Sequence, residues 1–323
     1  MMTMDRIGVL TSGADAPGMN AAIRSVVRSG VYYGVEMVGI KYGFQGLLNE
    51  SLEKMDASSV GSIIQRGGTI LQSYTCDEIY TDAGQEKAIE NLHKQGIDSL
   101  VVIGGREDLA VAASLQKKDF PCVGIPATID NDIPGVAEAI GFDTGLNTII
   151  DYIDRIRDTA SSHEKSSIIE VMGRDTGNLA LWSGLAGGAE NILIPEKKED
   201  MNTIIEQIKS GPSRDKRYSI IIVAEGSGVS GIDLNTRLKE EAGIESRVTV
   251  LGHTQRGGAP TARDRVLASR LGAHAIDLLL AQESGKVVGL KNNKLVSHTF
   301  EEVTSQMSKI DEGMYELSGR LSI

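Results

Sequence analysis

The chain has 323 residues, which is enough for two domains that each bury a hydrophobic core. Its net charge of -11 at pH 7 excludes a nonspecific binder of nucleic acid or of anionic membranes. The two cysteines, Cys76 and Cys122, form no disulfide framework and fit a reducing cytoplasm. No apolar run reaches the length of a membrane-spanning helix, and we expect no signal peptide before the first strand.

Short apolar runs alternate with stretches of helical periodicity along most of the chain. The expected strands are Ile7–Leu10, Glu36–Ile40, Ser99–Ile103, Cys122–Ile125, Ser167–Met172, Asn191–Ile194, Tyr218–Ala224 and Arg247–Leu251. Alternation of strands and helices predicts parallel sheets with helices on both faces, and therefore an α/β fold.

The helical stretches between these strands include Asn20–Tyr33, Asn147–Ser161, Asn202–Lys209 and Thr261–Gln282. In Asn147–Ser161 the apolar residues recur at helical spacing, while charged residues occupy the other faces. Because this long helix follows Gly141 closely, we expect a domain boundary there. Val287–His298 is expected to form a late hairpin around Asn292-Asn293.

One strand end has unusual chemistry. The strand over 101–103 runs into Gly104-Gly105, and Arg106-Glu107-Asp108 then opens a helix. At such a turn a nucleotide-binding α/β protein brings its backbone against phosphates. A phosphate-binding turn favours small residues and often one metal-binding carboxylate, whereas Arg106 and Glu107 are bulky and charged. The pattern therefore predicts an altered nucleotide site.

Other strand ends carry small or acidic residues, at the positions where α/β proteins bind ligands. Thr11–Asn20 would bring backbone N–H groups to an anion at a helix N-terminus, although its Gly and Pro also suit a plain turn. After Pro126, Asp130 is a candidate general base and Asp132 a candidate metal ligand. An ordinary turn rich in Asp and Asn is the alternative for this loop.

Basic residues lie near the later strands. Arg174, Arg247 and Arg256 have the fork geometry that suits a phosphate, and Glu225 suits sugar hydroxyls. Taken singly, each of these charged residues is more often solvated in a loop than bound to a ligand. His253 taken alone is more often a hydrogen-bonded structural histidine than a catalyst.

A second basic group begins on the first helix. Arg24 and Arg28 lie at i and i+4 and so share a face, and Arg157, Arg214 and Lys216 add further basic side chains. A solvated basic face is the default interpretation. A second anion site is the alternative if these residues meet in space.

Together these motifs resemble the bacterial ATP-dependent 6-phosphofructokinase family over essentially the full chain. The matching segments are Leu10–Asn20, Gly67-Gly68-Thr69, Val101–Gly105, Pro126–Asp132, Gly141-Phe142-Asp143-Thr144, Arg157–His163, Val171–Arg174 and Val250–Gly258. The resemblance implies two Rossmann-like three-layer α/β domains with mostly parallel sheets. Residues 1–141 with 254–304 would form the larger domain, and 142–253 with 305–323 the smaller. It also implies a cytoplasmic homotetramer that uses magnesium to transfer the γ-phosphate of ATP to the 1-hydroxyl of fructose 6-phosphate.

The resemblance assigns roles on the sugar-phosphate side. It implies that Asp130 is the catalytic base, that Thr128 lies beside the transferred phosphate, and that Arg174 joins this catalytic set. The implied substrate contacts are Thr128, Asp130, Asp132, Lys165, Met172, Gly173, Arg174, Glu225, Arg247, His253 and Arg256. At Arg247 and Lys165 the family has arginines that reach in from a neighbouring subunit. Lysine keeps the charge but loses the bidentate fork.

The resemblance also implies an effector site between subunits, which takes a nucleoside diphosphate or phosphoenolpyruvate in the family. The matching positions are Arg24, Arg28, Arg157, Glu190, Arg214 and Lys216. Ala57 replaces an arginine of the adjacent subunit, so we expect an altered effector response.

The chain departs from the family on the nucleotide side. Arg106 stands where the family has its magnesium-binding aspartate, and Glu107 and Asp108 replace a glycine and a serine beside the ATP phosphates. Thr75 replaces an arginine that stabilises the transferring group, and such an arginine is worth about a thousandfold in rate. The nucleotide-side positions are Gly13, Ala14, Thr75, Gly105, Arg106, Glu107, Asp108 and Val111.

These departures favour a regulatory subunit or pseudoenzyme, which binds fructose 6-phosphate and an effector but catalyses weakly or not at all. Magnesium binding would then be weak and would rest on Asp132. The subunit would form a homotetramer, or a hetero-oligomer with a catalytic paralogue. The alternative is an active ATP-dependent 6-phosphofructokinase of glycolysis, with the metal held by Glu107, Asp108 or Asp132. A non-enzymatic sugar-phosphate sensor is a third hypothesis. None of them involves nucleic acid or a membrane.

Overall fold

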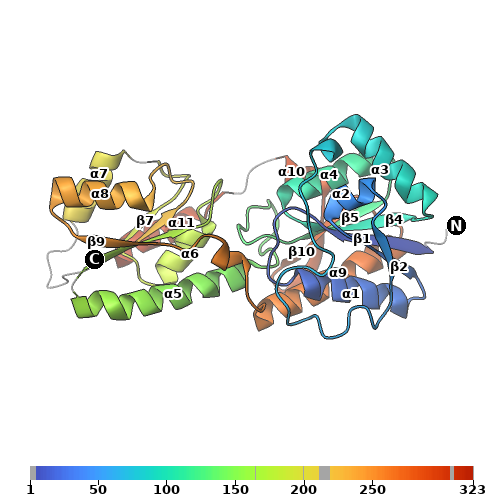
Figure 1. Cartoon of the computed structure of the whole chain (residues 1–323), viewed down its shortest axis with the longest axis horizontal. Helices are drawn as coiled ribbons and strands as arrows, with labels where there is room; N and C mark the ends of the chain where they lie inside the picture. Colours follow the sequence, from blue (N-terminus) through green and yellow to red (C-terminus); the bar gives the residue numbers. More distant parts are fainter. Residues whose placement is uncertain (1–4, 164, 199, 211–218, 306–308, 323) are drawn as a thin grey trace. The chain divides into compact units, whose positions relative to one another are not determined.

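The chain folds into two compact units. The computed structural model describes residues 5–163, 165–198, 200–210, 219–305 and 309–322. Unit 1 comprises Met1–Thr144 and Arg256–Met307, and unit 2 comprises Gly145–Gln255 and Ser308–Ile323 (Figure 1). The first boundary falls within the first turn of the long helix α5 (Phe142–His163), slightly later than the position expected from sequence. None of the described helices combines the length and the apolar composition needed to span a bilayer.

Unit 1 is built on a seven-stranded sheet with the order β11-β10-β5-β4-β1-β2-β3. Its strands are β1 (Arg6–Thr11), β2 (Glu36–Ile40), β3 (Leu52–Met55), β4 (Ser99–Gly104), β5 (Cys122–Pro126), β10 (Lys286–Lys291) and β11 (Lys294–Thr299). The central pairs are parallel, and β3 and β11 add antiparallel edges. All residues of β4 are buried, which accounts for its continuous apolar sequence.

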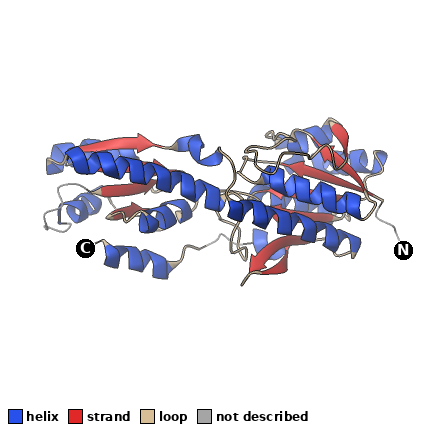
Figure 2. Cartoon of the chain, turned by 90° about the horizontal axis from the view of Figure 1, so that it is seen from below, coloured by secondary structure: helices blue, strands red, loops and turns tan. Residues whose placement is uncertain are grey.

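Helices cover both faces of this sheet, so unit 1 has three layers (Figure 1). On one face α1 (Met19–Tyr32) and α9 (Ala262–Leu280) pack side by side, and the view from below shows helices in front of the strands (Figure 2). The other face carries α2 (Gly43–Leu48), α3 (Asp82–Lys94), α4 (Arg106–Lys117) and α10 (Phe300–Thr304), with the short 3-10 helix η1 (Asp77–Tyr80) before α3. Leu100, Val102 and Leu109 belong to the hydrophobic core between β4 and this second layer.

Unit 2 contains a four-stranded parallel sheet with the order β7-β8-β6-β9. Its strands are β6 (Ser166–Val171), β7 (Asn191–Leu193), β8 (Ile220–Ala224) and β9 (Ser246–Val250). Its other elements are α5 from Gly145 onward, α6 (Asn178–Ala186), α7 (Met201–Ser210), α8 (Gly231–Ala242), α11 (Glu312–Leu321) and the 3-10 helix η2 (Gly252–Arg256). Ile221 and Val223 of β8 face the core with α7 and α8, whereas Ile222 faces α6. This alternation produces a helical layer on each side of the sheet.

The expected α/β fold with mostly parallel sheets is confirmed. Each expected strand is present, β2 with the expected bounds and the others with shifts of one or two residues at their ends. Tyr218, expected to begin a strand, lies outside the described residues. The hairpin is present as β10–β11, and Asn292 and Asn293 have φ of 50° and 60°, a left-handed conformation that asparagine tolerates. The sequence does not predict β3, because its residues Leu-Glu-Lys-Met lie at a partly exposed edge and carry no long apolar run.

Candidate functional site

The carboxyl ends of β1, β4 and β5 meet at one edge of the unit 1 sheet. Thr11 pairs with Ile103, and Gly104 pairs with Pro126, so the three strands end together. Beyond the ladder, Ser12 N–H donates to the carbonyl of Ile103 (3.1 Å). This edge therefore gathers the loops that carry the predicted residues Gly13, Gly105, Thr128 and Asp130.

The turn after β4 is closed by the side chain of Asp108. Gly105 caps α4, and its N–H donates to Asp108 Oδ2 at 3.0 Å. The Asp108 carboxylate also accepts a hydrogen bond from the Ser12 side chain, so it ties the loop after β1 to this turn. The side chain is only 5% exposed, and this burial raises the pKa of Asp108 to about 6.

Arg106 lies beside the loop that follows β5. Its Nε is 3.7 Å from Oδ2 of Asp132, and the two side chains are 27% and 17% exposed. The guanidinium therefore partly neutralises a carboxylate predicted to bind metal. Glu107, the next residue of the turn, is exposed.

The loop after β5 is held in place by its own backbone and side chains. Thr128 N–H donates to the carbonyl of Ile140 (3.0 Å), and Thr128 Oγ1 accepts from the N–H of Asp130 (3.2 Å). Asn131 has φ of 50°, and its Oδ1 accepts from the N–H of Ala139 (2.8 Å). Asn131 thus performs the turn role considered for this loop, and Asp130 remains half-buried at the strand end.

The carboxylates at this edge fit magnesium that is shared with nucleotide phosphates. Magnesium in phosphoryl-transfer sites is bound by one or two carboxylates together with phosphate oxygens and water. Asp130 and Asp132 supply such oxygens from one loop. Within the described ranges no group of three or more His, Cys, Asp or Glu side chains could hold a metal.

The other predicted nucleotide-side residues have different environments. Ala14 and Thr75 are exposed, in the loops after β1 and before η1 respectively. Val111 lies in α4 and is 2% exposed, because its side chain packs in the hydrophobic core. A ligand at the surface therefore does not touch the Val111 side chain in this conformation.

Unit 2 gathers three predicted sugar-phosphate residues at the carboxyl edge of its own sheet. Glu225 N–H donates to the carbonyl of Val171 (2.9 Å), which places Glu225 next to Met172 and Gly173. Gly173 has φ of 129°, which favours glycine at this turn. Arg174 follows in the same loop, is exposed and pairs with Asp175 at 3.1 Å.

The segment after β9 is fixed to the same edge by a residue that sequence reasoning missed. Gln255 is fully buried in η2, and its Oε1 accepts from the N–H of Met172 at 3.2 Å. His253 belongs to the same short helix and Arg256 ends it. No local pattern marks Gln255, because its role depends on a contact with a distant strand.

Lys165 and Arg247 lie at the opposite edge of this sheet. The register pairs Ser166 with Ser246, so both residues are at the amino ends of β6 and β9. Lys165 Nζ forms an ion pair with Glu245 Oε2 at 2.5 Å. The fold of a single chain therefore does not bring these two predicted substrate contacts together with Met172 and Glu225.

The predicted effector residues divide between the units. In unit 1, Arg28 on α1 donates from Nη2 to the carbonyl of Ala57 (3.3 Å), and Arg24 lies one turn earlier on the same face. In unit 2, Arg157 donates to the carbonyls of Gly187 and Gly188, and Glu190 Oε2 accepts from the N–H of Ile220 at 2.7 Å. Arg214 and Lys216 lie outside the described residues.

Asp264 is a buried carboxylate that sequence reasoning also missed. It is fully buried and accepts from the N–H groups of Gly141 and Thr144 (2.9 Å each) and from Thr144 Oγ1 (2.5 Å). Burial raises the pKa of Asp264 to about 6. A sequence signal does exist, because Thr261 and Asp264 have the spacing of a helix N-terminal capping motif.

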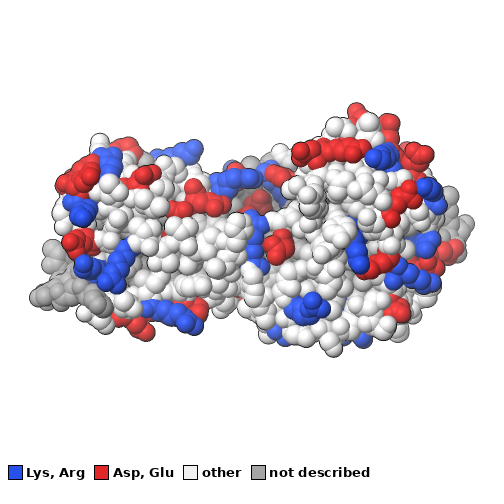
Figure 3. Space-filling view, in the orientation of Figure 1, with Lys and Arg blue, Asp and Glu red and all other residues white. Residues whose placement is uncertain are grey.

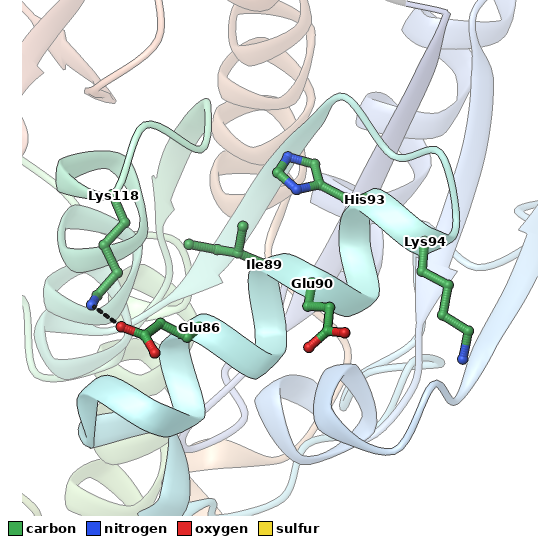
Figure 4. Close-up of a pocket in the computed structure, with 6 residues that line it drawn as sticks. All are labelled: Glu86, Ile89, Glu90, His93, Lys94 and Lys118. Carbon is green, nitrogen blue, oxygen red and sulfur yellow. Dashed lines mark ion pairs between the residues drawn. The ribbon is translucent and has the colours of Figure 1, made fainter.

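One cavity on the described surface of unit 1 contains none of the predicted site residues. A shallow cavity of about 690 Å³ lies along α3 (Figure 4), lined by Glu86, Ile89, Glu90, His93, Lys94 and Lys118. Lys118 Nζ is 3.5 Å from Glu86 Oε1, and none of the lining residues is a predicted site residue. Acidic and basic side chains are interspersed over the visible face of each unit (Figure 3).

Comparisons with known proteins show which family this chain resembles along its length. A model of the phosphofructokinase family matches residues 6–279. An ATP-dependent 6-phosphofructokinase of Oceanobacillus iheyensis is 59% identical over 320 residues, which cover 99% of this chain and all of that protein. One of Bacillus subtilis is 57% identical with the same coverage. A solved phosphofructokinase of Saccharomyces cerevisiae is 34% identical, has a TM-score of 0.85 and covers 93% of this chain. This chain spans 45% of the length of that yeast chain.

The expectation of a regulatory subunit or pseudoenzyme is wrong. Relatives that match at 57–59% identity along the whole chain are ATP-dependent 6-phosphofructokinases. Phosphoryl transfer draws on many positioning and charge-stabilising groups, so substitutions in one turn are a weak basis for inferring lost catalysis. The altered turn also keeps its strand–glycine–helix geometry, with Gly105 as the cap of α4. The expectation of weak magnesium binding rested on the same substitutions, and the relatives do not support it either.

Proposed function

The chain belongs to the phosphofructokinase family, and from this premise we propose that it catalyses the ATP-dependent phosphorylation of fructose 6-phosphate, a reaction of glycolysis in the cytoplasm. The observation that carries this proposal is the 59% identity to an ATP-dependent 6-phosphofructokinase over 99% of this chain. Identity of this extent along both units favours the same reaction rather than a shared fold alone.

Asp130 is the proposed general base. It removes the proton of the sugar 1-hydroxyl while that oxygen forms a bond to the γ-phosphorus of ATP. The bond between this phosphorus and the bridging oxygen breaks, and ADP leaves with the electron pair. The products are ADP, fructose 1,6-bisphosphate and one proton. The position of Asp130 after β5, half-buried and fixed by the N–H contact to Thr128 Oγ1, supports this role.

Binding of the sugar phosphate is assigned to the strand ends of unit 2. Met172, Gly173 and Glu225 lie side by side there, and the exposed guanidinium of Arg174 suits a phosphate group. In unit 1, the Thr128 hydroxyl lies in the same loop as Asp130 and is proposed to position the transferred phosphate.

Magnesium is the proposed cofactor, and it would neutralise charge on the nucleotide phosphates. Asp132 is the residue that would hold it, with phosphate oxygens and water completing the donor set. Asp132 would release Arg106 in doing so, because one carboxylate oxygen cannot fully serve both cations.

A homo-oligomer, tetrameric as in the family resemblance, is the proposed assembly. Lys165 and Arg247 support it, because they lie at the edge of the unit 2 sheet opposite Met172 and Glu225. From that edge they would reach the sugar phosphate of a second subunit. We also assign the effector role to Arg24, Arg28, Arg157 and Glu190, which would bind a nucleoside diphosphate or phosphoenolpyruvate.

The test is turnover by the purified chain with ATP, magnesium and fructose 6-phosphate, following both ADP and fructose 1,6-bisphosphate. The Asp130→Asn variant, prepared from the same host, measures background from the host enzyme. Loss of a general base lowers the rate by about 100-fold to 10,000-fold, so the two preparations should differ by that much. Equal rates in the two preparations would contradict the proposed function.

A further inference from the structure

The buried amide of Gln255 connects two segments that carry predicted sugar-phosphate contacts. One is the loop after β6, which begins at Met172, and the other is η2, which holds His253 and Arg256. Gln255 Oε1 accepts from the N–H of Met172 (3.2 Å), and its Nε2 donates to the carbonyl of Gly252 (2.9 Å). The side chain is fully buried, so both ends of the amide are satisfied by the protein itself.

Gln255 takes the place of a backbone acceptor at the point where the sheet ends. In a central parallel strand, successive residues bond alternately to the two neighbouring strands. The carbonyl of Glu170 accepts the N–H of Leu251 from the β9 side (3.0 Å), so by alternation the next N–H directed to that side is that of Met172. The carbonyl of Leu251 is already bonded to the N–H and the hydroxyl of Thr254 (3.3 and 2.7 Å) as the chain turns into η2. The Gln255 side chain therefore extends the ladder by one bond.

The same amide determines how η2 is oriented. Gly252 begins this helix with φ of 50°, a left-handed conformation that favours glycine, and Gln255 Nε2 closes the turn on the Gly252 carbonyl. In a 3-10 helix residues i and i+3 lie one above the other, so His253 and Arg256 share an edge and Gln255 lies on another. Gln255 is buried, whereas His253 is exposed. The anchored amide thus decides which edge of η2 projects the imidazole and the guanidinium.

On the β8 side the loop after β6 rests against backbone. Gly226 N–H donates to the carbonyl of Gly173 (3.1 Å), and a Cβ atom added at Gly226 would collide with the carbonyl oxygen of Arg174. Loss of the Gln255 bond would therefore release the loop toward β9 while its β8 side stays in contact. Such a movement changes the separation between Arg174 and η2.

We infer that Gln255 is a positioning residue for the sugar phosphate, because its amide holds the loop of Met172 and Arg174 in register with η2. The inference rests on the proposed function for the identity of the ligand. Gln255 acts through these neighbours rather than by contact with fructose 6-phosphate. Glutamine suits the position, since its amide supplies one acceptor and one donor at the same time.

The experiment measures the dissociation constant of fructose 6-phosphate by calorimetry, together with kcat and the KM values for both substrates. In Gln255→Met the side chain keeps its length but loses both hydrogen bonds. The dissociation constant should rise by about tenfold or more, because a displacement of about 1 Å in positioning groups can cost up to about a hundredfold. The KM for fructose 6-phosphate should rise in parallel. The KM for ATP should not follow, and kcat at saturation should fall by a smaller factor.

Asn91→Leu is the matched control, because Asn91 also connects two elements of the fold through its amide. Its Nδ2 donates to the carbonyls of Leu47 and Leu48 (3.1 Å each) in unit 1. This variant should lose stability in urea but keep the wild-type affinity for fructose 6-phosphate. Gln255→Asn is too short to keep both hydrogen bonds, so it should lose affinity in the same direction, and it replaces Gln255→Met if the latter does not fold.

A double-mutant cycle separates positioning from a purely structural role. In an Arg174→Ala background, the loss of affinity caused by Gln255→Met should be smaller, because one of the groups that Gln255 positions is missing. An unchanged dissociation constant in both Gln255 variants overturns the inference, and so does a loss of equal size with and without Arg174. Binding of fructose 6-phosphate that depends on Gln255 without any turnover would instead remove the proposed function and leave the inference standing.

Discussion

Nε of Arg106 lies 3.7 Å from Oδ2 of Asp132, which joins the first residue of α4 to the loop after β5. Both side chains are partly buried, and they belong to the two strand ends that were expected to bind phosphate and metal. The contact is longer than a hydrogen bond, so its energy is that of a modest ion pair. We expect a competition at this carboxylate, because the magnesium ion proposed for this site would need it as well.

Replacing Arg106 should reduce the magnesium requirement. In Arg106→Gln the Asp132 carboxylate keeps its position but loses its cation, so the half-saturating magnesium concentration should fall. A pair worth about 0.5–1 kcal/mol corresponds to a fall of about twofold to fivefold. The measurement is magnesium dependence of turnover, together with the rise in unfolding temperature that magnesium and ATP produce, which needs no catalysis.

Arg155→Gln provides the control for this prediction. Arg155 forms an exposed i,i+4 pair with Asp151 at 3.0 Å on α5, outside the strand ends. Its loss should leave the magnesium requirement unchanged. A higher magnesium requirement in Arg106→Gln would mean that the guanidinium assists the metal or the phosphates rather than competing with them.

Local sequence patterns predict the sheets well and the chemistry of the edge only in part. The buried residues of β4 and β8 form continuous apolar runs, and ligand loops follow parallel strands by a general rule. The side-chain direction of Asp108 is not local information, because it depends on Ser12 from another loop. The sequence therefore predicts an altered turn, but it cannot show that the carboxylate turns inward and leaves the strand–helix geometry intact. The role of Gln255 is not predicted for the same reason, because its partner Met172 is distant in the sequence.

The stability of the chain should depend on pH through Asp108. Its folded-state pKa of about 6 exceeds the unfolded value of 3.8, so the folded state binds the proton more tightly. This contribution is fully present below pH 3.8 and is lost as pH rises through about 6. The shift corresponds to at most about 3 kcal/mol. In Asp108→Asn the amide oxygen can still accept from Gly105 N–H, so the variant should gain stability relative to wild type at neutral pH.

Urea unfolding at about pH 5 and about pH 7.5 checks this prediction, with the relative stability of the variant rising between them by about 1–2 kcal/mol. Wild type and Asp108→Asn are compared at each pH, so titration of other groups cancels. If the difference in unfolding free energy is the same at both values, then Asp108 is not the titrating group.

Loss of Asp264 should destabilise unit 1 strongly. Its carboxylate accepts hydrogen bonds from the N–H groups of Gly141 and Thr144 and from the Thr144 hydroxyl. In Asp264→Ala these buried donors lose their acceptor, and we expect a cost of about 2–5 kcal/mol in unfolding free energy. The exposed cap residue Asp311 is the comparison, and Asp311→Ala should cost less. Denaturant unfolding of both variants tests the difference, and equal losses would contradict it.

Mixed oligomers should recover activity that neither parent has, if Arg247 reaches the site of a neighbouring subunit. Arg247 and Lys165 lie at the amino ends of β9 and β6, whereas Met172 and Glu225 lie at the carboxyl edge of the same sheet. An Arg247→Ala subunit keeps an intact Asp130, and an Asp130→Asn subunit keeps an intact Arg247. When equal amounts of the two are reassembled at random, about a quarter of the sites combine both intact residues. Turnover should therefore approach about a quarter of the wild-type rate at saturating fructose 6-phosphate.

Reassembly of each variant with itself is the control. If the mixture is no more active than the mean of its parents, Arg247 acts only in the active site of its own subunit, and the prediction is wrong.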